Sequence, residues 1–443
     1  MTLFSTLGLP KEIVSELSRS GITEAFPIQA AAIPDALTGK DVLGRGPTGS
    51  GKTFTFGLPI IARLAAQGAS VAGKPRALIL VPTRELAAQV RQRLSDPARV
   101  MGLRIIDIVG GVNINHHIRQ LAAPVDILVG TPGRIQDLIN QHKLFLDQVA
   151  ITALDEADQM ADMGFLPQVT KLLALTNKNS QRLLFSATLD NDIDKLVKKF
   201  LHNPVIHSTA PVQAAVATMQ HYQVRVGQRP ERNVLVAKIA ARHGKTIMFM
   251  RTKHGVDRQV KKLRRVGINA VGLHGDKGQS TRTRALEGFS TGTVPVLVAT
   301  DIAARGIDIS DVDLVVHVDP PAEHKAYLHR AGRTARAGAA GLVITLVMDT
   351  QIDEVEKLLK KAGVHAKLVD SHSVEKLTGA QEPHGSALPP FGAIVEKTSP
   401  QRTKAKKSSQ REQVFTARRA KKRNAQSNTW GKGSVERPQR RSR

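Results

Sequence analysis

A glycine-rich segment near the amino terminus has the spacing of a phosphate-binding loop. Residues 46–53 read Gly-Pro-Thr-Gly-Ser-Gly-Lys-Thr, which fits the pattern of Gly, four residues, Gly, Lys and then Ser or Thr. The loop follows an apolar pair and precedes a helix-like run, so backbone N–H groups would converge on phosphate oxygens. Lys52 would reach the terminal phosphates of a nucleotide and Thr53 would help to hold magnesium. An ordinary glycine turn is the less favoured alternative.

A run of acids follows an apolar segment farther along the chain. Asp155-Glu156-Ala157-Asp158 comes directly after residues 149–154. Ligands bind at the carboxyl ends of parallel strands, so one carboxylate could hold magnesium while its neighbour orients or deprotonates the attacking water. Taken alone, two acids after a strand suit the start of a helix equally well. The phosphate loop upstream favours the catalytic interpretation.

Short apolar runs alternate with helical patterns through the first 370 residues. Apolar, β-branched strands that are each followed by a helix indicate a parallel sheet covered on both faces. Residues 207–219 break the alternation, so we place a hinge linker there, between an α/β domain of residues 1–206 and a second one of residues 220–370. The expected strands are residues 77–81, 125–129, 149–154, 183–185, 246–250, 294–299, 314–318 and 342–347.

Positive charge is concentrated after these domains. The chain has 64 Lys and Arg against 38 Asp and Glu, a net charge of +26, and residues 395–443 hold 16 of the cations and three of the acids. Residues 371–390 collect Gly, Pro, Ser and His, and residues 395–443 have few apolar side chains, so residues 371–443 predict a disordered basic tail. Clustered cations attract RNA because they release counterions from phosphates. A solvated tail that only aids solubility is the alternative, and residues 418–423 also resemble a nuclear address.

Composition excludes several classes of protein. The chain has no cysteine, which rules out disulfides and thiolate metal sites. No apolar run approaches the roughly 18 residues that cross a bilayer, and the N-terminus lacks a signal-peptide pattern. We therefore expect a cytoplasmic protein with a polyanionic partner and no membrane association.

From the phosphate loop onward, the motifs follow an order that resembles the DEAD-box ATP-dependent RNA helicases of superfamily two. The run of residues 155–158 spells the name of this family, and the resemblance covers nearly all of residues 1–348. It implies two tandem RecA-like domains, with ATP and Mg²⁺ as cofactors and RNA as partner. The matching blocks are residues 26–29, 46–53, 82–86, 110–111, 131–134, 155–158, 186–188, 249–253, 274–289, 299–301, 305–308 and 327–338.

The resemblance also assigns roles at the nucleotide. Gln29 would read the adenine edge, Glu156 would activate water, and Lys52, Thr53 and Asp155 would hold phosphate and magnesium. Arg333 and Arg336 would be arginine fingers supplied by the second domain, so that neither domain alone completes the site. Further nucleotide contacts are expected from Gly46, Thr48, Gly49, Ser50, Gly51 and Asp308.

Two further sets of residues come from the same resemblance. Asp158, Ser186, Thr188 and His329 would couple the ATP site to the RNA side. The RNA contacts would read backbone and 2′-hydroxyl groups, which favours RNA over DNA with little sequence preference. They are Thr83, Arg84, Gly111, Thr131, Gly133, Arg134, Arg251, Gln279, Arg282, Thr300 and Asp301.

The chain departs from the family pattern at three places around the nucleotide. Ile22 stands where an aromatic residue is usual, Ala25-Phe26 replaces Pro-Thr, and the phosphate loop begins Gly46-Pro47-Thr48 where Ala-Gln-Thr is usual. Pro47 fixes its own φ and removes one N–H. We expect a shifted nucleotide affinity with activity retained.

The leading hypothesis is an RNA-stimulated ATPase that unwinds short RNA duplexes or remodels RNA–protein complexes. An ATP-controlled RNA clamp would use the same residues and stays open as an alternative. A non-catalytic RNA chaperone or scaffold is disfavoured by the intact Lys52 and Glu156, and a DNA translocase by the resemblance. Some bacterial members act in ribosome assembly or RNA turnover, which makes ribosomal precursors and the RNA-turnover machinery candidate partners.

Overall fold

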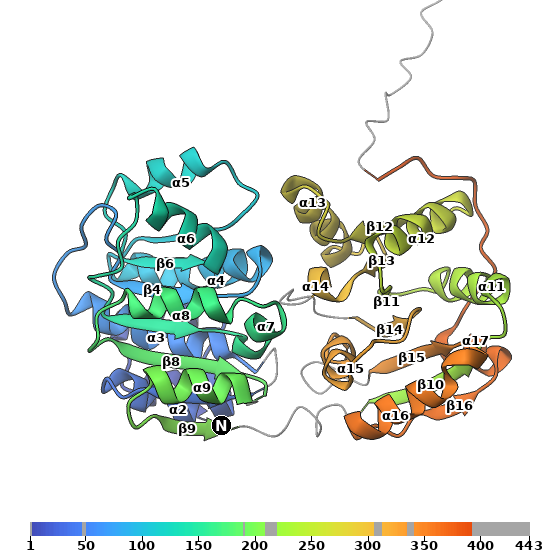
Figure 1. The fold of residues 1–443 in the computed structure, drawn as a ribbon, viewed down its shortest axis with the longest axis horizontal. Helices are drawn as coiled ribbons and strands as arrows, with labels where there is room; N and C mark the ends of the chain where they lie inside the picture. The colour runs from blue at the N-terminus through green and yellow to red at the C-terminus, as the bar shows by residue number, and fades with distance from the viewer. Residues whose placement is uncertain are drawn as a thin grey trace, which may run out of the picture. The chain divides into compact units, whose positions relative to one another are not determined.

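The computed structural model describes residues 2–46, 50–188, 191–208, 219–304, 312–334 and 341–391. They form two lobes, lobe 1 before residue 209 and lobe 2 from residue 219, each built on a seven-stranded sheet (Figure 1). In the described segments, no helix is both long and apolar enough to cross a lipid bilayer. The predictions for Pro47, Thr48, Gly49, Asp308, Arg336, most of the linker and the tail beyond residue 391 lie outside the described residues.

The sheet of lobe 1 is parallel throughout, with strand order β5-β6-β4-β7-β8-β3-β9. The four strands at its centre are fully buried, which explains why apolar residues dominate their sequences, although β8 also buries Gln181, Arg182 and Ser186. A short antiparallel pair, β1 (Thr2–Leu3) with β2 (Glu24–Ala25), precedes the sheet. The strands are β3 (Val42–Arg45), β4 (Ala77–Leu80), β5 (Ile105–Ile108), β6 (Ile127–Gly130), β7 (Ile151–Leu154), β8 (Gln181–Ser186) and β9 (Val205–Ser208).

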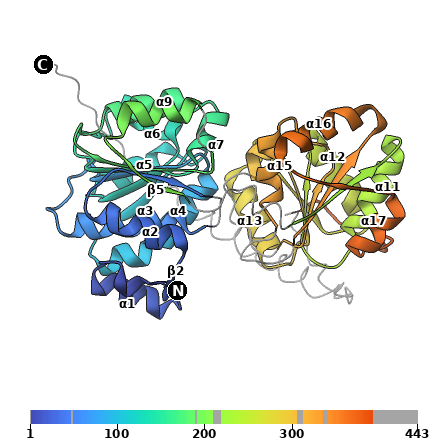
Figure 2. The same ribbon diagram turned by 90° about the horizontal axis from the view of Figure 1, so that it is seen from below.

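Helices cover both faces of this sheet, as Figure 2 shows. Four helices bury their apolar sides in one core cluster and five in the other, so the sheet is the middle of three layers. The first group is α1 (Lys11–Arg19), α2 (Pro27–Leu37), α3 (Lys52–Ala65) and α4 (Arg84–Val100); the second is α5 (Ile114–Leu121), α6 (Pro132–Asn140), α7 (Ala157–Asp162), α8 (Leu166–Ala174) and α9 (Asn191–Phe200).

Lobe 2 repeats the topology of lobe 1 strand for strand. Its parallel sheet has the order β12-β13-β11-β14-β15-β10-β16, the lobe 1 order with each strand replaced by its counterpart. The strands are β10 (Gln220–Arg225), β11 (Thr246–Phe249), β12 (Ala270–Leu273), β13 (Val296–Ala299), β14 (Leu314–His317), β15 (Leu342–Val347) and β16 (Lys367–Val369). The helices α11 (Arg229–Ala240), α12 (Lys253–Arg265) and α17 (Ser371–Thr378) cover one face, and α13 (Gln279–Ser290), α14 (Asp301–Ala304), α15 (His324–Ala331) and α16 (Ile352–Ala362) cover the other.

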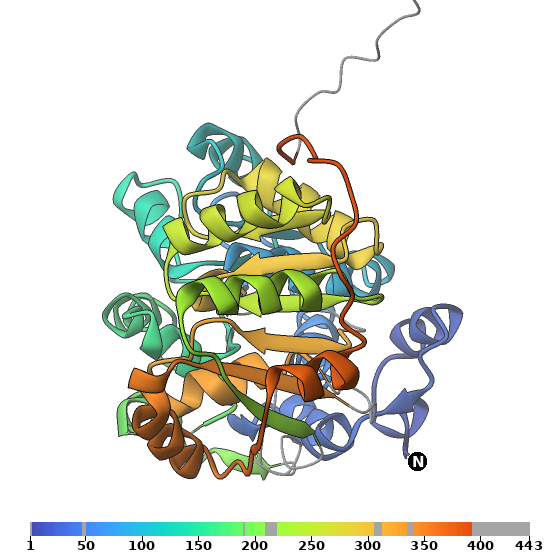
Figure 3. The same cartoon turned by 90° about the vertical axis from the view of Figure 1, so that its right-hand side faces the viewer.

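Two predicted boundaries differ from the structure. The linker was expected from residue 207, but His207 and Ser208 belong to β9 and pair with β3. The tail was expected to be disordered from residue 371, but Asp370 caps α17 and Val374 is fully buried against lobe 2. Residues 379–391, which we call the strap, then run across lobe 2 (Figure 3, in orange-red).

Backbone hydrogen bonds hold the strap, which is why its composition gave no sign of order. Gln381 donates its N–H to the Lys238 carbonyl over 3.1 Å, and Leu388 donates to the Arg264 carbonyl over 2.8 Å. Each carbonyl lies near the C-terminal end of a helix, where such groups lack intrahelical partners. The described part of lobe 2 therefore extends about twenty residues beyond the predicted boundary.

Candidate functional site

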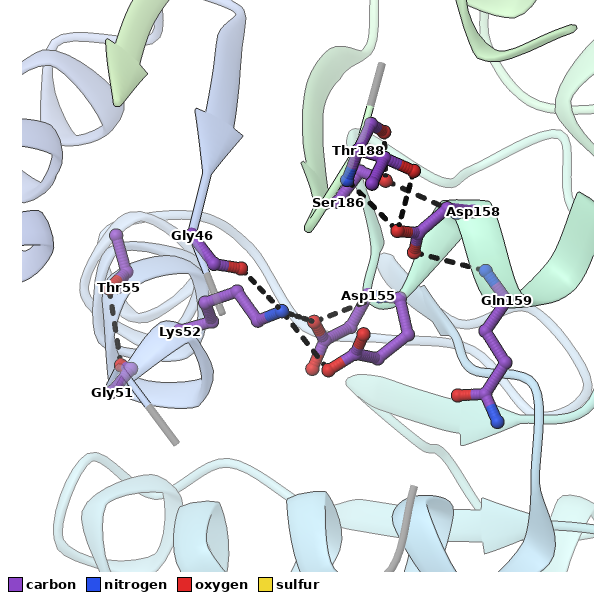
Figure 4. Close-up of polar contacts among 10 residues, drawn as sticks. Gly46, Gly51, Lys52, Thr55, Asp155, Asp158, Gln159, Ser186 and Thr188 are labelled. Atoms are coloured by element: carbon purple, nitrogen blue, oxygen red, sulfur yellow. Dashed lines mark hydrogen bonds and ion pairs between the residues drawn. The ribbon is translucent and has the colours of Figure 1, made fainter. Parts of the chain in front are cut away.

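The phosphate loop and the acid run meet at the carboxyl ends of β3 and β7. Lys52 Nζ lies 3.0 Å from Glu156 Oε1 and 3.9 Å from Asp155 Oδ1, and it donates to the Gly46 carbonyl over 3.2 Å (Figure 4). All three ionisable residues are at least 95% buried. The adjacency of β7 and β8, with β3 next to β8, brings together groups 104 residues apart in the sequence.

Burial and charge shift the pKa values in this cluster. Burial by itself would lower the pKa of Lys52, but the carboxylates of Glu156 and Asp155 outweigh it and raise that pKa. Burial raises the pKa of Asp155 to about 7, against the opposing effect of Lys52. A cation and two acids held together out of water, with perturbed pKa values, are typical of a reactive site.

Glu156 has a backbone conformation that L-residues rarely adopt. Its φ of 55° and ψ of 51° are left-handed, and it stands immediately before the first residue of α7. Its N–H donates to Asp155 Oδ1 over 3.0 Å, so the turn after β7 is tight. Such a conformation costs of order 1–3 kcal/mol and tends to persist at functional sites. Here it directs the carboxylate of Glu156 toward Lys52.

Gln29 is tied to the phosphate loop. Its Oε1 accepts from the Phe26 N–H over 2.8 Å and its Nε2 donates to the Gly51 carbonyl over 2.9 Å, with 1% of the residue exposed. Gly51 has a φ of 88°, and a Cβ there would lie 2.6 Å from that amide nitrogen, so the position requires glycine. The side chain predicted to read adenine thus lies against the loop predicted to hold phosphate. Phe26, the departure from the family pattern, exposes 53% of its surface.

The donors expected for magnesium are present on lobe 1. Thr53 is in the first turn of α3, and Asp155 follows β7; both are buried. Among the described residues, no three His, Cys, Asp or Glu side chains gather into a metal cage. One carboxylate and one hydroxyl fit magnesium, which commonly takes few protein ligands and completes its shell with water and substrate phosphates.

Three of the four predicted coupling residues form one buried network. Asp158 Oδ2 accepts from both the N–H and the hydroxyl of Thr188, over 2.9 and 3.0 Å (Figure 4). Ser186 Oγ accepts from the Asp158 N–H over 3.2 Å and donates to the Thr188 carbonyl over 2.7 Å. The acid run after β7 is therefore joined to the segment after β8. His329 is on α15 of lobe 2, and its coupling role stays a prediction.

The predicted RNA contacts of lobe 1 gather at one depression. Thr83, Arg84, Thr131, Gly133 and Arg134 all line it. Thr83 caps α4 by accepting from the Leu86 N–H, and a Cβ on Gly133 would meet nothing within 4 Å, which leaves its backbone open to a ligand. Gly111, with a φ of 75°, lies so close to Arg84 that a Cβ would overlap the guanidinium.

His117 is a supporting residue that the motif comparison did not find. Arg134 Nη1 donates to the Val112 carbonyl over 2.7 Å and lies 3.0 Å from His117 Nδ1. Burial and the Arg134 charge lower the pKa of His117 to about 4, so the ring is neutral and accepts this hydrogen bond. His117 is 2% exposed and therefore fixes the Arg134 side chain. The contact spans seventeen residues, and no local spacing signals it.

The described lobe 2 residues lie after the strands as expected. Arg251 follows β11, Thr300 follows β13, and Gln279 begins α13. Arg282 is 8% exposed and donates to the His274 carbonyl over 3.2 Å. Arg333, the described candidate finger, is 5% exposed.

Arg330 has a structural role that the sequence did not reveal. Its guanidinium binds Asp301 through both oxygens, with 2.8 Å from Nη2 to Oδ2, and stacks 5.0 Å from the Phe249 ring centroid. Arg330 is 2% exposed, so it does not belong to an exposed face of α15. Asp301, predicted to contact RNA, is engaged by this arginine, and an RNA contact there stays a prediction.

Comparison with known sequences finds a matching protein family for each lobe. Residues 26–196 match the DEAD/DEAH box helicase family, and residues 231–338 match the helicase conserved C-terminal domain. The chain is 38% identical to the DEAD-box ATP-dependent RNA helicase CshA of Geobacillus kaustophilus, over 81% of this chain and 76% of that protein. It is 40% identical to ATP-dependent RNA helicase CshA of Listeria monocytogenes, over 82% of this chain and 69% of that one.

Solved structures show the same fold. S. cerevisiae Dbp5 bound to RNA and ADP BeF3 is 26% identical, with a TM-score of 0.74 over 86% of this chain and 99% of that one. Mss116p bound to ssRNA and AMP-PNP is 25% identical, with a TM-score of 0.72 over 85% of this chain and 82% of that one. The two seven-stranded parallel sheets are those of tandem RecA-like domains.

Proposed function

Since this chain belongs to the DEAD-box ATP-dependent RNA helicases, we propose that its ATP is hydrolysed at the buried Lys52–Glu156 cluster of lobe 1, in response to bound RNA. The observation that carries this proposal is the 3.0 Å contact between Lys52 Nζ and Glu156 Oε1, with Asp155 beside them. Lys52 would bind the β- and γ-phosphates, displacing its present contact with Glu156. Glu156 is then left to accept a proton from the attacking water.

Magnesium would be held by Thr53 and Asp155 together with the nucleotide. When bound, it would neutralise charge that develops on the phosphate oxygens. Gln29 would turn its amide from Phe26 and Gly51 toward the adenine edge, which presents a matching donor and acceptor. Arg333 of lobe 2 would neutralise negative charge that develops on the γ-phosphate. Arg336 is proposed for the same role from the family motif.

The coupling step rests on the network of Asp158, Ser186 and Thr188. Asp158 is two residues beyond Glu156, so a shift of the acid run when ATP is cleaved would reach the segment after β8 directly. Phosphate and 2′-hydroxyl contacts from the depression around Thr83 and Arg134 would follow that shift. We propose that this releases one strand of a short RNA duplex. We place the activity in the cytoplasm, where ATP and RNA occur together.

Glu156→Gln tests the proposal. The amide preserves shape but cannot accept the proton, so ATP and RNA affinities should stay within about threefold while turnover falls by at least about 100-fold. Glu12→Gln, an exposed change in the first turn of α1, is the matched control and should hydrolyse ATP normally. Turnover by Glu156→Gln at the rate of the control would show that another group activates the water.

A further inference from the structure

The α12 helix presents a strongly basic face that the proposed reaction does not use. It carries six Lys or Arg residues and a single acid, Asp257. Asp257 is already paired, because Lys277 Nζ lies 2.8 Å from its Oδ1 and His274 Nε2 lies 3.1 Å from the same atom. Lys261 and Arg265 are exposed, and neither makes an ion pair or a side-chain hydrogen bond within the described part of the chain. The face therefore has uncompensated positive charge.

The strap turns this face into a cavity. Arg264 donates from Nε to the Pro389 carbonyl over 2.7 Å, and Leu388 donates to the Arg264 carbonyl, so the strap is fixed along the end of α12. The space between the strap and α12 is about 500 Å³ and partly open to solvent, and this volume is within the usual range for ligand sites. Its charged lining is mainly cationic, because Lys261, Arg264, Arg265 and Lys277 outnumber the single carboxylate of Asp257. Its apolar lining comes from Val260, Val271, Leu388, Pro390 and Phe391.

Two glycines allow the strap to lie close to the end of α12. Gly267 has a φ of 82° and faces Gly385, and a Cβ on Gly267 would lie 2.5 Å from the Gly385 Cα. Phe391 is half-buried and packs against the core cluster that contains Val271 of the edge strand β12. An aromatic ring beside cations is a combination that suits a nucleotide, whose base stacks and whose phosphate is anionic.

The cavity adjoins the predicted RNA contacts of lobe 2. Thr281 lines it, and this residue lies between Gln279 and Arg282 in the first turn of α13. Lys277 precedes them by two residues and also lines it. A strand that leaves Gln279 and Arg282 would thus reach the cavity without crossing another element of lobe 2.

We propose that this cavity is a second RNA site, which takes a single-stranded nucleotide flanking the strand bound at the predicted contacts. The base would stack on Phe391 above Val271, and the neighbouring phosphates would bind Lys261 and Arg265. This inference rests on RNA being the partner in the proposed function. It adds a contact outside the motifs, and it predicts that affinity depends on the length of the RNA.

Paired substitutions test the site in the full chain. Lys261→Gln with Arg265→Gln removes two cations of the cavity, while Lys360→Gln with Lys361→Gln removes two exposed cations from α16 as the matched control. RNA affinity is measured at several salt concentrations with single strands of about 8 and about 30 nucleotides. Every protein keeps the same tail, so the contribution of the tail cancels. Loss of two single-strand phosphate contacts should reduce the slope of log K against log salt by about 1.4 for the long strand only.

Two further readouts locate the base. Phe391→Leu keeps an apolar side chain but removes the ring, and it should weaken binding of the long strand about tenfold. A long strand carrying 4-thiouridine should crosslink to residues 388–391. Equal salt slopes for the Lys261→Gln, Arg265→Gln variant and its control, together with no such crosslink, would overturn the proposal. The same result is expected if an acidic protein segment, and not RNA, occupies the cavity. RNA-stimulated ATP hydrolysis with the short strand tests the proposed function separately, because that strand does not reach the cavity.

Discussion

Replacing Asp158 by Asn should uncouple ATP hydrolysis from RNA unwinding. The carboxylate accepts two hydrogen bonds from Thr188 and one from the Gln159 N–H over 3.0 Å. An amide has one oxygen, so if it faces Thr188 its NH₂ group opposes the Gln159 N–H. The loss is the charge-assisted part of two bonds, about 1 kcal/mol each, and one unsatisfied buried donor, about 1–3 kcal/mol. These losses sum to about 3–5 kcal/mol, so we expect the segment after β8 to be loosened by at least about 3 kcal/mol.

The assay compares unwinding of a short RNA duplex with ATP turnover in the same sample. If unwinding requires the segment after β8 to stay in its hydrogen-bonded position, a change of about 3 kcal/mol lowers the amount of RNA unwound per ATP by up to about 100-fold. ATP affinity should stay within about threefold, because Lys52 and Glu156 are untouched. Asp194→Asn, on the exposed side of α9, removes the same charge and should leave both rates unchanged. Equal loss of unwinding and ATP turnover in Asp158→Asn would refute the coupling role.

Gln29→Ala should reduce the preference for ATP over GTP by at least about tenfold, because it removes the only side-chain amide that we place at the base; competition binding with both nucleotides measures this. His117→Leu removes the acceptor of Arg134 and should weaken RNA binding severalfold, and His117→Gln should restore it. Because the folded pKa of His117 is about 4, below its ordinary value of 6.5, the unfolded chain binds more protons between these values, so stability falls as pH drops through that window. In denaturant titrations, the free energy of unfolding of His117→Gln should fall less at acid pH than that of the parent protein. An identical pH profile of the two proteins would contradict this.

The sequence predicted four adjacent central strands of each sheet and missed the edge strands together with the inner strands β3 and β10. The strands β4, β6 and β7 are buried on both faces and are dominated by apolar residues, and β8 is apolar at residues 183–185. By contrast, β9 alternates between half-buried and exposed residues, and two of the three residues of β16 are exposed. An edge strand has one neighbour and tolerates polar residues, so its sequence does not stand out.

The sequence predicted those residues of the candidate site that belong to contiguous sequence motifs. The motif residues are close together in the structure because the carboxyl ends of the neighbouring strands β7, β8 and β3 lie on the same side of the sheet. These residues are Lys52, Asp155, Glu156 and Asp158. The support around these motifs could not be predicted: the left-handed conformation of Glu156 and the strap depend on tertiary contacts. Residues 371–391 were misread because Gly, Pro and Ser suggest disorder, whereas backbone hydrogen bonds to helix ends hold them.

The most direct test of the central claim is the ATP turnover of the full chain with and without single-stranded RNA. If RNA completes a site whose phosphate loop, magnesium ligands and water-activating acid all lie on lobe 1, turnover without RNA should be close to that of Glu156→Gln. Saturating RNA should then raise it by at least about 100-fold, and DNA of the same length should raise it less. Equal turnover with and without RNA would contradict the account.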